Sequence, residues 1–121
     1  MQLQAERKKW FGIKKIKNKK MNPIITNNLS QIKDLCQKHH VKELYVFGSV
    51  TTDKFRDDSD VDFSYIMDEV PLEKSADNFF DLLWKLEDVF NRKVDLVNEK
   101  YLDNKYFIRE LNEKKQLLYH G

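Results

Sequence analysis

The most informative stretch of this chain is residues 44–67, LYVFGSVTTDKFRDDSDVDFSYIM. Its first four residues form an apolar run typical of a buried strand, and Gly48-Ser49 ends that strand. After ten intervening residues, Asp60-Val61-Asp62 opens a second strand in which polar and apolar residues alternate. Because side chains at positions i and i+2 of a strand share one face, the stretch predicts two strands with both carboxylates on the same face.

The rest of the sequence predicts a small α+β fold. Apolar residues at three- and four-residue spacing indicate helices, and short apolar or alternating runs indicate strands. We expect helices at about residues 23–39, 71–90 and 104–114, and strands at about 41–47, 60–67, 93–97 and 117–119. This order suits a small mixed or antiparallel sheet with helices packed on one side. The expected apolar stripe of residues 71–90 is Leu72, Ala76, Phe79, Phe80, Leu83, Leu86 and Phe90.

Length and charge divide the chain into two parts. With 121 residues it is long enough for one small domain. Residues 1–20 carry eight Lys/Arg against one Glu, whereas residues 21–121 carry fourteen Lys/Arg against nineteen Asp/Glu. We therefore expect a basic N-terminal extension, residues 1–20, followed by one domain over residues 21–121. The extension is interpreted as a disordered leader, as sequence upstream of a start at Met21, or as a weak basic amphipathic helix.

Composition argues against several classes of protein. The sequence has no apolar run of about 18 residues, so neither a transmembrane helix nor a membrane partner is expected. Cys36 is the only cysteine, which excludes an intrachain disulfide and a thiolate zinc site and favours the cytoplasm. The acidic balance of residues 21–121 argues against nucleic acid as a partner, because nucleic-acid-binding surfaces need clustered cations.

Asp60 and Asp62 are candidate catalytic and metal-binding residues. Two like charges about 4 Å apart repel by roughly 4 kcal/mol at an effective dielectric constant of about 20. Such a pair persists when a cation lies between the carboxylates or when one of them takes up a proton. Asp95, inside the apolar run of residues 94–97, is a third carboxylate that an adjacent strand would bring near them. Oxygen ligands favour Mg²⁺, and three carboxylates suit two magnesium ions and nucleotidyl transfer, with Asp95 also a candidate general base.

Gly48 and Ser49 are the candidate nucleotide-binding residues. A glycine at the end of a strand lets the backbone approach a phosphate without a Cβ in the way. The serine hydroxyl and the backbone N–H groups that follow it can then meet phosphate oxygens. A Gly-Ser pair alone is most often a plain turn, so its weight comes from its distance to Asp60 and Asp62. Together these residues indicate nucleotide chemistry.

At these residues the chain resembles the nucleotidyltransferase superfamily typified by DNA polymerase beta. It is most similar to the minimal nucleotidyltransferases (MNT proteins) that accompany HEPN proteins in prokaryotic toxin–antitoxin pairs. The resemblance covers about residues 22–120 and lies in residues 44–49, 58–63, 93–97 and 117–119.

This resemblance implies that the chain transfers AMP from ATP to a tyrosine of a HEPN ribonuclease encoded nearby, which AMPylation silences. In this interpretation Gly48 and Ser49 bind the triphosphate, and Asp60, Asp62 and Asp95 bind magnesium.

One segment departs from the family pattern. Many relatives carry arginine and a second glycine soon after Gly-Ser, where this chain has residues 50–53, VTTD. Lys54 and Arg56 are candidates to supply the positive charge. The departure keeps a non-catalytic antitoxin, which neutralises its toxin by binding alone, as an alternative function. A nucleotidyltransferase acting on a small molecule or tRNA is a further alternative.

Overall fold

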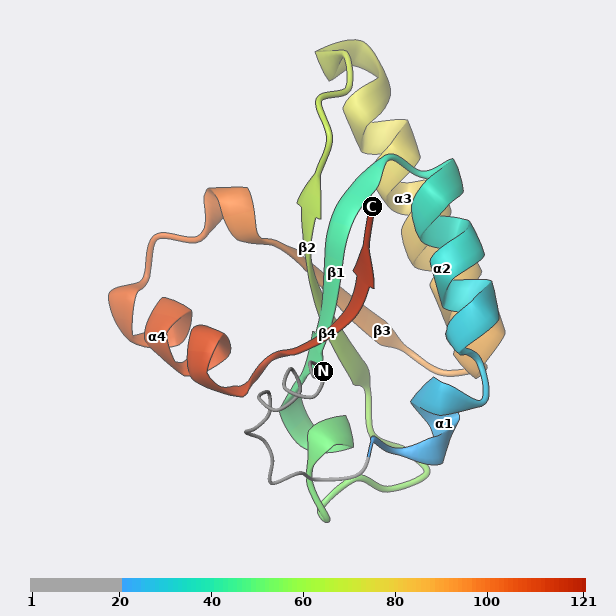
Figure 1. Ribbon diagram of the computed structural model, residues 1–121, viewed down its shortest axis with the longest axis vertical. Coiled ribbons are helices and arrows are strands. Elements are labelled where there is room, and N and C mark those ends of the chain that lie inside the picture. Colours follow the sequence, from blue (N-terminus) through green and yellow to red (C-terminus); the bar gives the residue numbers. More distant parts are fainter. Residues whose placement is uncertain (1–20) are drawn as a thin grey trace, which may run out of the picture.

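A computed structural model describes residues 21–121, and the expectations for residues 1–20 lie outside this part (Figure 1). The elements are, in chain order, α1 (Pro23–Thr26), α2 (Leu29–Lys38), β1 (Val41–Phe47), the 3-10 helix η1 (Gly48–Thr51), β2 (Val61–Met67), α3 (Leu72–Phe90), β3 (Val94–Asn98), the 3-10 helix η2 (Glu99–Tyr101), α4 (Lys105–Lys114) and β4 (Gln116–His120).

The four strands form one mixed sheet in the order β3-β2-β1-β4. β1 pairs antiparallel with both β2 and β4, while β2 pairs parallel with β3. Parallel neighbours need a crossover connection, and α3 supplies it. The strands that the sequence predicted are therefore present, and the α+β fold with a small mixed sheet is confirmed.

The two faces of the sheet have different surroundings. Helices α2 and α3 cover one face, and α4 lies on the opposite side (Figure 1). On the covered face the core includes the buried residues Ile32, Leu44, Val46, Val61, Phe63, Leu82 and Leu86. On the other face the Phe47 ring meets the Phe107 ring of α4 edge-on, with ring centres 6.1 Å apart. One-sided helix packing therefore describes α2 and α3, whereas α4 belongs to the open face.

The first predicted helix, residues 23–39, is divided into two. The Asn22 side chain accepts a hydrogen bond from the Ile24 N–H at 2.9 Å and so caps the start of α1. The Asn28 side-chain amide donates to the Ile24 carbonyl oxygen at 2.8 Å, which is the acceptor that the Asn28 backbone N–H would use in a continuing helix. The side chain of Asn28 thus replaces the helical bond, and α2 begins one residue later.

The predicted stripe of α3 was wrong in part. Leu72 is 87% exposed and Phe80 is 45% exposed, whereas Leu82, which the stripe left out, is buried with Leu86 and Phe90. Leu72 is the first residue of α3, and the first turns of this helix extend beyond the ends of the strands (Figure 1). The 3.6-residue period fits two neighbouring faces of this helix, and packing against α2 and β3 selects the one that contains Leu82. None of the helices in residues 21–121 combines the length and hydropathy needed to cross a membrane.

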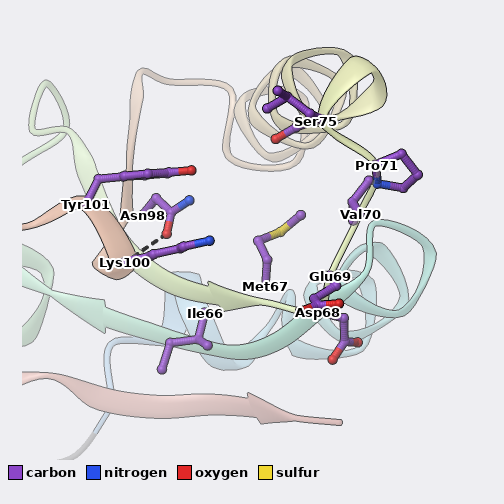
Figure 2. Close-up of a pocket in the computed structure, with 11 residues that line it drawn as sticks. Ile66, Met67, Asp68, Glu69, Val70, Pro71, Ser75, Asn98, Lys100 and Tyr101 are labelled. Carbon is purple, nitrogen blue, oxygen red and sulfur yellow. Dashed lines mark hydrogen bonds between the residues drawn. The ribbon is translucent and has the colours of Figure 1, made fainter.

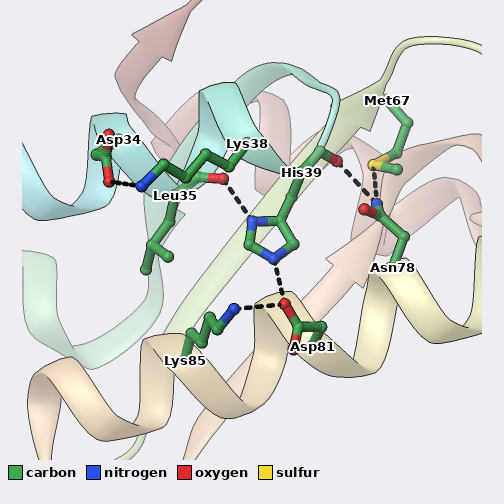
Figure 3. Close-up of polar contacts among 8 residues, drawn as sticks. All are labelled: Asp34, Leu35, Lys38, His39, Met67, Asn78, Asp81 and Lys85. Carbon is green, nitrogen blue, oxygen red and sulfur yellow. Dashed lines mark hydrogen bonds and ion pairs between the residues drawn. The ribbon is translucent and has the colours of Figure 1, made fainter.

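A buried histidine joins α2 to α3 (Figure 3). The Nδ1 atom of His39 lies 2.7 Å from the Leu35 carbonyl oxygen, and its Nε2 atom lies 2.6 Å from Asp81 Oδ2. The two contacts lie on opposite sides of the ring, so the His39 side chain bridges the backbone of α2 and the Asp81 side chain of α3. The Asn78 side chain donates to the His39 carbonyl oxygen at 2.8 Å and completes the connection.

Asp81 and Asp34 offer a matched test of this connection. Each carboxylate pairs with the lysine four residues later, but Asp81 also contacts the buried His39 ring. We expect Asp81→Ala to lower the Tm by several degrees, because a buried ring nitrogen loses its partner. Asp34→Ala should change the Tm by no more than about one degree, because it removes only an exposed ion pair. Thermal unfolding followed by circular dichroism makes the comparison, and equal shifts would show that the contact with His39 adds nothing.

Candidate functional site

The sheet register brings the predicted site residues of three strands together. Phe47 at the end of β1 pairs with Asp62 of β2, and Asp62 pairs with Asp95 of β3. Gly48 directly follows Phe47 and lies against Asp62, because a Cβ at position 48 would overlap the Asp62 carboxylate oxygen Oδ2. Gly48 also has a φ of +79°, a conformation that glycine adopts readily. This position thus requires glycine for two separate reasons.

Asp60 lies in the loop directly before β2. It was expected to open the second strand, but β2 begins one residue later, at Val61. Asp60 and Asp95 are both exposed, while Asp62 is partly buried between them and Gly48. Asp60 and Asp62 thus lie at the start of β2, and Asp62 is paired with Asp95 at the start of β3.

The charge of Asp62 is not compensated by the protein. The pKa of its carboxyl is raised from 3.8 to about 6, first by burial, then by the charge of Asp95 and last by the charge of Asp60. No lysine or arginine within residues 21–121 lowers it. Among residues 21–121, no group of three or more His, Cys, Asp or Glu side chains is arranged so that it could hold a metal ion. Exposed, uncompensated oxygen donors fit a hard cation such as Mg²⁺.

The turn after Gly48 is held by its own side chains. Thr51 Oγ1 donates to the Gly48 carbonyl oxygen at 2.7 Å, and Thr52 Oγ1 donates to the Ser49 carbonyl oxygen at 2.8 Å. Val50 is 3% exposed and belongs to the hydrophobic core. The residues that stand where many relatives carry arginine and glycine thus shape and anchor the Gly48-Ser49 turn. Lys54 and Arg56 are exposed in the loop that follows.

Arg92 is a residue of this region that the sequence analysis did not single out. Its guanidinium donates to the carbonyl oxygens of Arg56 at 3.0 Å and Ser59 at 2.9 Å. The same group lies 4.6 Å from the centre of the Phe55 ring. Arg92 therefore ties the loop that leads into Asp60 to the start of β3. The one local hint was its place two residues before that strand, which is too weak to identify a long-range contact.

Two cavities differ in their distance from the carboxylates. The larger, about 700 Å³, lies at the far end of β2 and is lined by residues that include Met67, Asp68 and Tyr101 (Figure 2). Asp62 and Met67 are five positions apart, a span of roughly 17 Å along a strand. The smaller cavity, about 270 Å³, is lined by Gly48 itself. The smaller cavity thus adjoins the candidate site, and the larger does not.

Residues 30–121 match the family described as Polymerase beta, Nucleotidyltransferase. The chain belongs to this family. A curated relative, "Putative protein adenylyltransferase MJ1379" of Methanocaldococcus jannaschii, is 30% identical over 93 residues, which are 70% of this chain and 92% of the relative. The family resemblance stated for residues 44–49, 58–63 and 93–97 is thereby confirmed, and the enzyme class is that of a nucleotidyltransferase.

Solved structures share the fold of this nucleotidyltransferase. The "Structure of putative minimal nucleotidyltransferase" has a TM-score of 0.66 at 22% identity, over 82% of this chain and 97% of that chain. A crystal structure of a toxin–antitoxin with AMP-PNP has a TM-score of 0.61 at 20% identity, over 78% and 74%. A tri-AMPylated Shewanella oneidensis HEPN toxin in complex with MNT antitoxin has a TM-score of 0.56 at 18% identity, over 79% and 72%. At these identities the matches establish the polymerase beta-like fold.

The raised pKa of Asp62 predicts a stability that depends on pH. Above about pH 6 the folded protein carries the unfavourable charge, whereas below about pH 4 the carboxyl is largely protonated in both folded and unfolded states, so the cost disappears. We expect Asp62→Asn to stabilise the metal-free protein at about pH 7.5 by about 1 kcal/mol, a value reduced for the solvent screening of this partly exposed group. At about pH 3.5 the same substitution should change little.

Denaturant unfolding in the presence of EDTA measures both values. Asp77→Asn, at an exposed position of α3, controls for the loss of one negative charge. An equal gain from Asp62→Asn at both pH values would contradict the electrostatic origin of the effect.

The contacts of Arg92 predict a local effect on the loop before Asp60. We expect Arg92→Ala to speed amide hydrogen exchange in residues 55–60, because the Arg56 and Ser59 carbonyls lose their donor. Exchange in β1 should stay unchanged. Lys93→Ala, at the exposed neighbouring position, is the control. Uniformly faster exchange across the sheet would indicate a general loss of stability instead.

Proposed function

We propose that this protein is a Mg²⁺-dependent nucleotidyltransferase that transfers AMP from ATP to a hydroxyl group, a tyrosine, of a partner HEPN toxin encoded nearby, and so acts as a cytoplasmic antitoxin. The observation that carries the proposal is the contact between Gly48 and the Asp62 carboxylate, with Asp95 paired beside it. That contact joins a backbone able to approach phosphate to a group of uncompensated carboxylates.

The relatives support the choice of nucleotide and acceptor. The curated relative from Methanocaldococcus jannaschii is named as a protein adenylyltransferase, and one structure with this fold is a toxin–antitoxin with AMP-PNP. Another contains a tri-AMPylated HEPN toxin with its MNT antitoxin. In addition, Asp60 and Asp95 are exposed on the open side of the sheet, where an acceptor as large as a protein can reach them.

The proposed reaction gives each site residue a task. Backbone N–H groups after Gly48 and the Ser49 hydroxyl bind the triphosphate. The acceptor oxygen attacks the α-phosphorus, the bond to the bridging oxygen of pyrophosphate breaks, and the acceptor proton passes to the Asp95 carboxylate. Asp60, Asp62 and Asp95 would hold two Mg²⁺ ions, which when bound neutralise phosphate charge and lower the pKa of the acceptor hydroxyl.

A second candidate function is neutralisation of the toxin by binding alone. Burial of Val50 favours it, because the side chain that follows Ser49 packs into the core and offers no charge to the phosphates. In this case the fold and the partner stay the same, and turnover is weak or absent.

Labelled ATP distinguishes the two functions. We expect ATP carrying ³²P at the α-phosphate, with Mg²⁺, to label the toxin. The double variant Asp60→Ala with Asp62→Ala should reduce labelling by more than about 100-fold, because charge stabilisation at the phosphates is lost. Asp77→Ala with Asp88→Ala, on exposed positions of α3, controls for the loss of two negative charges.

Toxin activity is measured in the same mixtures. Toxin that is silenced without label, or label that is unaffected by the Asp60 and Asp62 substitutions, would contradict the enzymatic proposal. Silencing without label would support binding alone.

A further inference from the structure

The cavity of about 270 Å³ beside Gly48 has two walls from distant parts of the chain. Phe47, Gly48 and Thr52 line one side, and Phe107, Leu111 and Lys114 of α4 line the other. Phe47 is paired with Asp62 across the strands, so one wall of the cavity neighbours the candidate site. A ligand bound through phosphates at Gly48 and Ser49 would have this cavity as its nearest enclosed space.

The walls of the cavity are aromatic and aliphatic. The rings of Phe47 and Phe107 meet edge-on, with an interplanar angle of 76°. Leu111 is buried below them, yet Phe107 stays 37% exposed. A phenylalanine that served only to pack α4 on the sheet would be expected to bury more of its ring. Phe107 thus presents apolar ring surface at the cavity, where a planar apolar group can pack against it.

The rim of the cavity is polar. Glu110 and Lys114 form an ion pair of 2.8 Å one turn apart on α4, and both line the opening. Apolar walls with a few polar groups at the edge are the usual composition of a small-molecule site. A volume of about 270 Å³ lies just below the range of pockets for drug-sized ligands, and it suits one ring system.

The α4 wall is fixed to the sheet at its end. Lys115, the C-cap residue of α4, pairs with Glu99 at 3.0 Å and lies 4.0 Å from the centre of the Tyr45 ring. The Ser64 hydroxyl of β2 donates to the same Glu99 carboxylate at 2.7 Å. These contacts link α4, η2, β1 and β2 on the open face. The cavity is therefore preformed, which lowers the cost of ordering a ligand in it.

We propose that this cavity binds the base of the nucleoside triphosphate, with the Phe107 ring packed against the base. The inference rests on the proposed function, since it places the base of the same nucleotide whose phosphates bind at Gly48 and Ser49. In this proposal α4, which supplies none of the candidate metal-binding residues, distinguishes a nucleotide from bare polyphosphate.

Inorganic tripolyphosphate separates base binding from phosphate binding. In the presence of Mg²⁺, the full-length protein should bind ATP more tightly than tripolyphosphate. We expect Phe107→Ala to weaken ATP binding about tenfold, because stacking on an aromatic ring is lost, while tripolyphosphate binding changes by less than about twofold. Tyr106→Ala, which removes an exposed neighbouring ring of α4 outside the cavity, should leave both affinities unchanged. Titration calorimetry measures the affinities, and circular dichroism verifies that each variant folds.

The possible outcomes distinguish failure of the base site from failure of the proposed function. ATP and tripolyphosphate binding equally well to the unsubstituted protein, or weakening equally in Phe107→Ala, would overturn the base site and leave the proposed function standing. An unchanged ATP affinity in Phe107→Ala would also overturn it. If the unsubstituted protein binds neither compound, the proposed function and the base site fail together.

Discussion

Asp62 and Asp95 are paired across two parallel strands, and the hydrophobic core prevents that pairing from relaxing. Asp62 lies between the buried residues Val61 and Phe63, and Asp95 lies between Val94 and Leu96. A shift of one residue along either strand would place a carboxylate in the core and a core side chain in water. The apolar residues therefore enforce a repulsion that the carboxylates alone would avoid. A cation can relieve this repulsion, which is why the site suits a metal-dependent reaction.

The two faces of the sheet have different roles: one packs the hydrophobic core, and the other carries the candidate site. On one side α2 and α3 bury the core, and His39 connects these helices through Leu35 and Asp81. On the other side lie the carboxylates, the Gly48 turn and α4, joined by polar contacts such as that between Glu99 and Lys115. Substitutions on the open face can thus change ligand binding while the core stays intact. This division lets a chain of 121 residues fold and still expose an acidic site.

The segment that departs from the family pattern has a structural explanation. Val50 packs in the core, and Thr51 and Thr52 bond back to the turn, so these residues hold Gly48 and Ser49 in place. Arg92 does the same for the loop before Asp60, from a position that adjoins β3. The candidate phosphate-binding and metal-binding residues are therefore positioned largely by neighbouring residues that are not themselves candidate ligands.

The sequence by itself determined the strands, the open-face carboxylates Asp62 and Asp95, and the family, because strand alternation and the spacing from Gly48 to Asp60 are local properties. It also indicated the helices, but it placed one helix where Asn28 divides two, and it left the buried Leu82 out of the apolar stripe of α3. The role of Arg92, the join at His39 and the cavity between Phe47 and Phe107 were decided by tertiary structure alone. Each depends on residues far apart in the chain, whose proximity is set by the packing of the sheet rather than by local periodicity.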